Sequence, residues 1–232
     1  MSSGKYDVLL FAEHGLYEPA LEPQNQMHNR MCVMNKDTFT RLSYNTNDKD
    51  PKWNQYGGTG ITLNADMRAR KAKDGVGGDP TKLGRWTWTK ICGKGGITSV
   101  FVSVYRSCCN PDGLHTVWSQ QARYFKDHED IQEPDVQALF TRDLCNFLGD
   151  LRDDSNNVVL GMDANDDVRD GEVTRALWEI GMFEAVVSNH KDKSVPATCA
   201  KNTQRKPIDN IWTSPGLTVL RCGFLTGLGG HL

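Results

Sequence analysis

The sequence predicts an α/β protein in which two β-sheets pack against each other and helices cover their outer faces. Segments with the patterns of strands and helices interleave along the chain. Residues 85–105, RWTWTKICGKGGITSVFVSVY, indicate a hairpin because two β-rich runs flank the turn GKGG. A hairpin requires antiparallel pairing, so the mixture favours two packed mixed sheets over a doubly wound parallel sheet.

The other expected strands are short apolar or alternating runs. Tyr6–Ala12 is apolar and ends in charge, which indicates a buried strand. Residues 38–45 alternate in polarity, and residues 57–67 carry glycines for a tight turn followed by apolar residues on one face. Further strands are expected at 157–162, 207–217 and 218–226.

Helices are expected where apolar residues recur at helical spacing. Residues 18–34 should be helical in their later part, since prolines suit a helix entrance. The other expected helices are 116–128, 135–152 and 171–181. Residues 68–84 are polar, basic and glycine-rich, and we expect a mobile loop there. No repeat or break in composition divides the chain, so residues 1–232 are expected to form one domain.

Composition places the chain among ordinary globular proteins. Of its 232 residues, 38% are hydrophobic and 24% are charged, and the formal net charge is −2. No signal-peptide pattern is seen, and no stretch approaches the roughly 18 apolar residues that span a bilayer. The seven cysteines are odd in number and form no CxxC pair. We therefore expect reduced thiols without a zinc site, an intracellular (nuclear or cytoplasmic) protein, and no membrane partner.

The segment VVLGMDAND at residues 158–166 runs a hydrophobic strand straight into Asp163, Asn165 and Asp166. Polar groups crowded at a strand end repel one another and cost desolvation unless a cation or water binds them. A solvated turn is the simpler explanation of such a cluster. Both interpretations remain open from this segment alone.

Acidic or acid-partnered residues also follow other strands far apart in the sequence, at Glu13, Asp209 and His231. If these ends converge with Asp163, their oxygens can hold a hard divalent cation such as Mg²⁺ or Mn²⁺. Such an ion can polarise a phosphoryl oxygen and acidify water. Taken singly, each residue can equally be a surface residue or a turn cap.

The order of six motifs resembles the endonuclease/exonuclease/phosphatase superfamily. The motifs are DVLLFAEHG, YGGTGITLN, SVFVSVYRS, VVLGMDAND, PIDNIW and the closing GGHL. The resemblance covers almost the whole chain, and GRWTWTKICGKGGITSVFVSVYR and TVWSQQARYF look most like retroelement-associated members. It implies a four-layer, DNase I-like sandwich with the active site at one end of two packed sheets.

The resemblance also implies roles for individual residues in an in-line hydrolysis of a phosphate ester by metal-activated water. Glu13 would be the metal ligand, and Tyr105 would contact the phosphate or the leaving oxygen. Asp163 would orient and deprotonate the attacking water, and Asn165 would hold that water or the phosphate. The remaining pair completes the set: Asp209 would orient His231, which would bind the scissile phosphate.

The chain departs from the family pattern in three respects. The family's first strand, which carries a metal-holding Asn, has no counterpart before Tyr6–Ala12. Gly230 stands where the family has Asp, and no strand follows His231. We therefore expect a domain that lacks its first and last strands, with exposed edges, poor stability and a tendency to self-associate.

Basic residues suggest where a substrate binds. Arg106 adjoins Tyr105 at the expected mouth of the site, and Arg68, Arg70 and Lys71 lie in a basic stretch that can grip a nucleic-acid backbone or simply be solvated. Lys73, Lys82 and Arg85 belong to the same stretch.

The favoured function is a Mg²⁺-dependent hydrolase of DNA, with a reverse transcriptase domain as a partner in the same element. The alternatives are a hydrolase of small phosphate esters or phospholipid headgroups, and a degenerate copy without activity.

Overall fold

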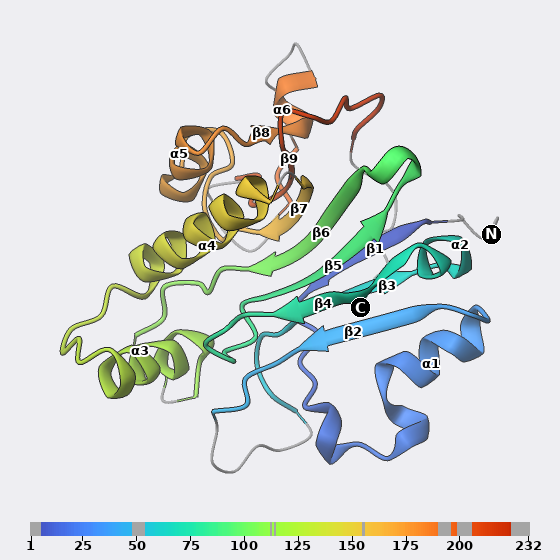
Figure 1. Ribbon diagram of the computed structural model, residues 1–232. Helices are drawn as coiled ribbons and strands as arrows, with labels where there is room; N and C mark the ends of the chain where they lie inside the picture. The colour runs from blue at the N-terminus through green and yellow to red at the C-terminus, as the bar shows by residue number, and fades with distance from the viewer. Residues whose placement is uncertain are drawn as a thin grey trace.

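The computed structural model describes residues 6–47, 54–111, 113, 115–154, 156–189, 196–198 and 206–223. In these residues two β-sheets pack face to face and helices lie on their outer sides (Figure 1). This arrangement confirms the predicted α/β sandwich of two packed sheets, although among the described residues only the larger sheet is mixed.

The smaller sheet has three antiparallel strands in the order β1-β3-β2. Prolines open the two short 3₁₀ turns that precede the first helix, and that helix packs against β2. The elements of this part are β1 (Val8–Ala12), η1 (Glu18–Ala20), η2 (Pro23–Asn25), α1 (Met27–Met34), β2 (Phe39–Ser43), β3 (Thr59–Leu63) and α2 (Ala65–Ala69).

The larger sheet has six strands in the order β4-β5-β6-β7-β9-β8, and only the β6–β7 pair is parallel. Its strands are β4 (Lys71–Gly78), β5 (Trp86–Cys92), β6 (Thr98–Tyr105), β7 (Asn157–Asp163), β8 (Phe183–Glu184) and β9 (Asp209–Thr213). Its helical elements are η3 (Lys94–Gly96), α3 (Val117–His128), α4 (Val136–Asp153), α5 (Glu172–Glu179) and α6 (Ala185–Asn189). The predicted hairpin is β5–β6, and the helices predicted at 116–128, 135–152 and 171–181 are α3, α4 and α5.

The main hydrophobic core lies between the larger sheet and helices α4 and α5. Trp86 of β5 is buried there and stacks on Phe147 of α4 at 5.5 Å between ring centroids. A smaller core around Ile61 and Leu63 lies between the two sheets. The sheets are also joined by polar contacts, since Ser103 Oγ of β6 donates to the carbonyl of Phe11 in β1 at 2.8 Å. These contacts fix the ends of the two sheets relative to each other.

Two predictions about secondary structure are wrong. Residues 68–84 do not form a loop, because they contain the end of α2 and strand β4. The glycines of β4 allow close packing, since a Cβ on Gly77 would lie 2.6 Å from the ring of Trp88. Residues 218–223 form no strand, and the rest of the expected strand, 224–226, lies outside the described residues.

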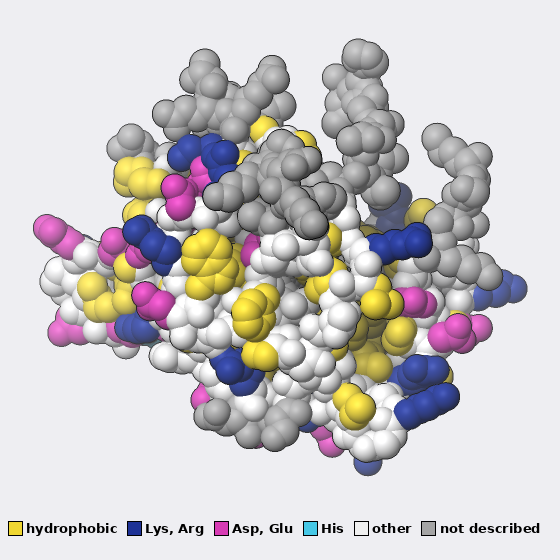
Figure 2. Space-filling view, turned by 90° about the horizontal axis from the view of Figure 1, so that it is seen from above, with side chains coloured by type: hydrophobic (Ala, Val, Ile, Leu, Met, Phe, Trp, Pro, Cys, Tyr) yellow, Lys and Arg dark blue, Asp and Glu magenta, His cyan; other side chains and the backbone are white. Residues whose placement is uncertain are grey.

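Apolar side chains remain exposed in the described part of the chain. β1 pairs with β3 alone there, and the exposed large side chains include Leu9, Phe183 and Ile211. Figure 2 shows hydrophobic patches between Lys and Arg side chains on one face of the molecule. Self-association through these edges and faces stays a prediction. Among the described residues, no helix is long and apolar enough to cross a membrane.

Arg85 is fully buried and therefore lies away from the solvent-facing basic stretch suggested by the sequence. Its Nε donates to Asp79 Oδ2 at 2.7 Å, and its Nη1 donates to Asp143 Oδ2 at 2.8 Å. The guanidinium also lies over the ring of Trp86, 4.7 Å from the centroid. Arg85 therefore ties β5 to α4 through a buried ion network.

The Asp79→Ala substitution should lower the free energy of unfolding by about 3–5 kcal/mol, because it leaves a buried guanidinium undercompensated. Urea denaturation followed by circular dichroism measures this change. Asp127→Ala on the exposed end of α3 is the control and should change stability by less than about 0.5 kcal/mol. Equal effects of the two substitutions would contradict the structural role of the network.

Candidate active site

Three polar side chains lie in a row across neighbouring strands of the larger sheet. Tyr105 at the end of β6 is the register partner of Asp163 at the end of β7, and Asp163 is the partner of Asp209 at the start of β9. Directly paired residues project from the same face of a sheet. The strand register therefore places two carboxyl groups and a phenol side by side.

Glu13 reaches this row from the other sheet. It follows the last residue of β1, has a positive φ of 52°, and donates its backbone N–H to the carbonyl of Gly58 at 2.8 Å. The hydroxyl of Tyr105 hydrogen-bonds to the Glu13 side chain. The sequence prediction that Glu13 and Asp163 come together, although 150 positions apart, agrees with this geometry.

Among these carboxyl groups, Asp163 has a pKa that its surroundings shift away from the ordinary value. Burial, followed by the negative charges of Asp209 and Glu13, raises the pKa of Asp163 to about 7. Burial and the hydrogen bond to Glu13 also raise the pKa of Tyr105 well above its ordinary value, so its phenol stays protonated at neutral pH. The row thus contains one carboxyl group that titrates near pH 7 and one neutral hydrogen-bond donor.

Asn165 is held beside this row by the turn that follows β7. It has a positive φ of 45°, which Asn tolerates better than most residues. Its Nδ2 donates to the carbonyl of Arg106 at 2.7 Å, and its backbone N–H donates to Asp163 Oδ1 at 3.3 Å. The turn therefore fixes the amide of Asn165 and supports the carboxylate of Asp163.

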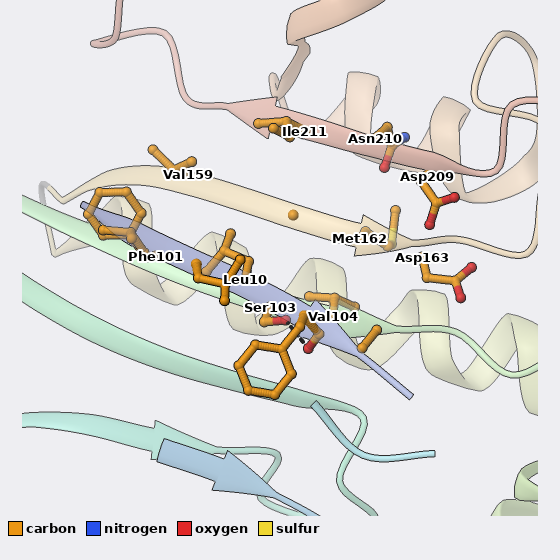
Figure 3. A pocket seen from close by; sticks show the side chains of 15 residues that line it. Leu10, Phe101, Ser103, Val104, Val159, Met162, Asp163, Asp209, Asn210 and Ile211 are labelled. Carbon is orange, nitrogen blue, oxygen red and sulfur yellow. Dashed lines mark hydrogen bonds between the residues drawn. The ribbon is translucent and has the colours of Figure 1, made fainter. Parts of the chain in front are cut away.

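A cavity of about 360 Å³ runs between β1 and the larger sheet, and Asp163 and Asp209 line it. Figure 3 shows these two carboxyl groups at the same end of the cavity, and apolar side chains such as Leu10 and Phe101 farther along it. The carboxyl groups therefore face a common space between the sheets.

The oxygen donors of this row suit a hard divalent cation better than a soft one. Burial, and after it the negative charges of Asp209 and Glu13, raise the pKa of Asp163, and a cation would offset the repulsion between the charges. In the described part of the chain, no group of three or more His, Cys, Asp or Glu side chains can hold a metal ion. Mg²⁺ is commonly held in proteins by one or two carboxylates together with several waters.

The predicted contact between Arg106 and substrate is wrong for this structure. Arg106 is only 2% exposed, and its guanidinium faces the carboxylates of Asp166 and Glu172 at 3.8 and 3.3 Å. It also donates to the carbonyl of Ala164 at 3.5 Å. Arg106 therefore holds the turn after β7 in place and does not present its charge to solvent.

The basic residues Arg68, Arg70 and Lys71 lie at the other end of the smaller sheet. They follow β3, whose last residue Leu63 pairs with Val8 at the start of β1, whereas Glu13 follows the end of β1. Five strand residues of roughly 3.3 Å each separate the two ends. A nucleic-acid contact by these residues stays a prediction, and it would lie away from the carboxyl groups.

His231 lies outside the described residues, so its predicted role is not tested by the geometry. One contact was not predicted: the thiol of Cys108 donates to Asn165 Oδ1 at 3.0 Å. No pattern in the sequence joins residues 57 positions apart in this way. His14 next to Glu13 is structural, because Ser43 and Leu16 engage its two ring nitrogens.

Comparisons with known proteins agree with this architecture. Neither a protein-family profile nor a curated protein sequence matches the chain. Solved structures do match. The 3′-5′ exonuclease NExo from Neisseria meningitidis aligns with a TM-score of 0.57 and 15% identity over 93% of this chain and 79% of its own.

Two further matches have different activities. A mannosyl-6-phosphatase of Bacteroides thetaiotaomicron has a TM-score of 0.55 and 12% identity over 90% of this chain and 72% of its own. An AP endonuclease from Archaeoglobus fulgidus has a TM-score of 0.52 and 13% identity over 91% and 77%. The chain therefore has the fold of the endonuclease/exonuclease/phosphatase proteins. Because these neighbours act on different phosphate esters, the fold alone does not select a substrate.

Proposed function

We propose that the chain is a divalent-metal-dependent phosphoesterase of the endonuclease/exonuclease/phosphatase type, and that its substrate is DNA. The observation that carries the proposal is the meeting of Glu13 from one sheet with Tyr105, Asp163 and Asp209 from the other. A carboxyl group with a perturbed pKa that faces a cavity, as Asp163 does, is typical of catalytic sites.

Asp163 is the general base of the proposed reaction. A base works best when its pKa lies near the operating pH, and the pKa of Asp163 is raised to about 7. It takes the proton from the water that attacks phosphorus. Asn165 holds that water or a phosphate oxygen, and the protonated Tyr105 donates a hydrogen bond as charge develops on the phosphate or the leaving oxygen.

Glu13 is the ligand proposed for Mg²⁺ or Mn²⁺, and water and phosphate oxygens would complete the coordination. When bound, the ion supplies positive charge that polarises the phosphate ester. Glu13 keeps its hydrogen bond from Tyr105, which orients the carboxylate toward the row on the larger sheet.

His231 is proposed to bind the scissile phosphate, with Asp209 orienting its ring. Chain length permits this. Cys222 is held by a hydrogen bond from its thiol to the carbonyl of Ala185 at 3.1 Å, and Ala185 follows β8, the neighbour of β9. His231 is nine positions beyond Cys222 in the sequence. An extended chain covers roughly 3.3 Å per residue, so the sequence distance does not prevent a contact between His231 and Asp209 at the start of β9.

A substrate panel tests the proposal. In Mg²⁺ the chain should nick supercoiled plasmid or cleave an abasic duplex, and EDTA should stop the reaction. His231→Asn should reduce the rate by about 10²-fold, whereas His128→Asn on exposed α3 should not change it. Release of inorganic phosphate from sugar phosphates without DNA cleavage would replace DNA with a small ester. No hydrolysis of either substrate class would favour the degenerate, non-catalytic alternative.

A further inference from the structure

A second cavity opens beside the proposed active site, on the side away from Asp209. Its volume is about 470 Å³, within the range of pockets that hold a nucleoside-sized ligand. Glu13 and Tyr105 form its inner wall, so it is continuous with the row of polar side chains. The residues that line the rest of the cavity include Tyr56, Asn110, His115 and Trp118.

Aromatic side chains converge on this cavity from two separate segments. Tyr56 is 66% exposed and precedes Gly57, while Trp118 lies in the first turn of α3. A Cβ on Gly57 would lie 2.9 Å from Val117 and 3.6 Å from the ring of Tyr105. This glycine therefore lets the Tyr56 segment approach the start of α3, beside the proposed active site.

The polar groups of the cavity suit an uncharged ring better than a second phosphate. Among the described residues that line it, none is Lys or Arg, and Glu13 contributes a negative charge. Asn110 offers an amide that can both donate and accept hydrogen bonds. Ser107 is 2% exposed, and its buried hydroxyl has no hydrogen-bond partner in the described part of the chain.

We propose that this cavity binds one nucleobase of the substrate, stacked on Trp118 and Tyr56, while the adjoining phosphate lies at Glu13 and Tyr105. The inference rests on the proposed function and assigns to this cavity the part of the substrate that it would hold, namely one base. Every base has an aromatic face, so stacking gives affinity with little sequence preference. A sugar phosphate or a lipid headgroup has no flat aromatic ring that can stack between these side chains.

Equilibrium binding to the full chain tests this proposal without relying on catalysis. Isothermal titration calorimetry compares deoxyadenosine 5′-monophosphate with 2-deoxyribose 5-phosphate, both with Mg²⁺ present. The nucleotide should bind at least about 10-fold more tightly. Trp118→Leu and Tyr56→Leu should each weaken nucleotide binding by about 5- to 100-fold and leave sugar-phosphate binding unchanged.

Trp178→Leu on α5 is the matched control, because Trp178 is an exposed tryptophan outside the cavity and should not affect either ligand. Trp118→Phe keeps an aromatic face and should retain most of the affinity, which separates loss of stacking from loss of folding. Equal binding of the two ligands by the unchanged chain, or equal weakening of both by Trp118→Leu, would overturn the base site. Base-dependent binding without hydrolysis would support the cavity and contradict the proposed activity, so the two failures are distinguishable.

Discussion

The Asp163→Asn substitution should reduce Mg²⁺-dependent hydrolysis by about 10²- to 10⁴-fold and yet raise the melting temperature of the protein at pH 8. The loss of rate follows because an amide cannot accept the proton of the attacking water. The gain in stability follows because the amide removes a buried negative charge from beside Asp209 and Glu13.

The pH dependence of that gain has a definite sign. In the unfolded chain Asp163 has its ordinary pKa of 3.8, whereas in the fold its pKa is about 7. Between these values the folded protein keeps a proton that the unfolded chain has lost. Stability contributed by this group therefore falls as the pH rises from about 4 to about 7, and the penalty stays constant above that.

Melting temperatures of the wild type and Asp163→Asn should consequently be similar near pH 4 and diverge up to pH 8. Thermal denaturation followed by circular dichroism in a pH series measures this difference. Asp127→Asn, an exposed carboxyl group on α3, serves as the control and should show no such divergence. A variant that is less stable than the wild type at pH 8 would contradict the claim that the ionised, buried Asp163 destabilises the folded protein.

The Glu13→Gln substitution should abolish stabilisation of the protein by Mg²⁺ and lower the hydrolysis rate by about 10²-fold or more. A ligand that binds only the folded state stabilises it by RT ln(1 + [L]/Kd), which is about 2.7 kcal/mol at 100 times Kd. The amide oxygen of Gln can still accept the hydrogen bond from Tyr105, so the local fold should persist.

Differential scanning calorimetry measures this effect as the change in melting temperature between a sample without Mg²⁺ and samples in which the Mg²⁺ concentration rises in 10-fold steps. Glu22→Gln, at an exposed position near η2, keeps the same change of charge and should respond to Mg²⁺ like the wild type. An unchanged response of Glu13→Gln to Mg²⁺ would show that the ion binds elsewhere.

Much of the fold and the central part of the site follow from the sequence because they depend on local patterns and strand ends. The apolar run before Asp163 becomes β7, and the hairpin at 85–105 becomes β5–β6. A polar residue that ends a strand lies at the end of the sheet where that strand ends, so the strand itself fixes its position. The strand ends alone left open whether Glu13 and Asp163 converge, and the resemblance to the endonuclease/exonuclease/phosphatase superfamily implied that they do.

The parts that the sequence did not predict depend on contacts between distant residues. The glycines of β4 are typical of a loop in the sequence. In the structure a side chain on Gly77 would collide with the ring of Trp88. Arg106 looks like a phosphate ligand until the turn after β7 brings Asp166 and Glu172 to it. A sequence pattern gives the charge of such a side chain but not the partners that bury it.

The most direct test of the account is the position of a divalent ion in crystals of the protein soaked in MnCl₂. The account predicts an anomalous difference peak about 2 Å from a carboxylate oxygen of Glu13, in the space that Asp163 faces from the opposite sheet. The claim that the two sheets meet around a catalytic metal ion would be contradicted if the site were well ordered and showed no peak. It would also be contradicted if the only peaks lay next to other residues.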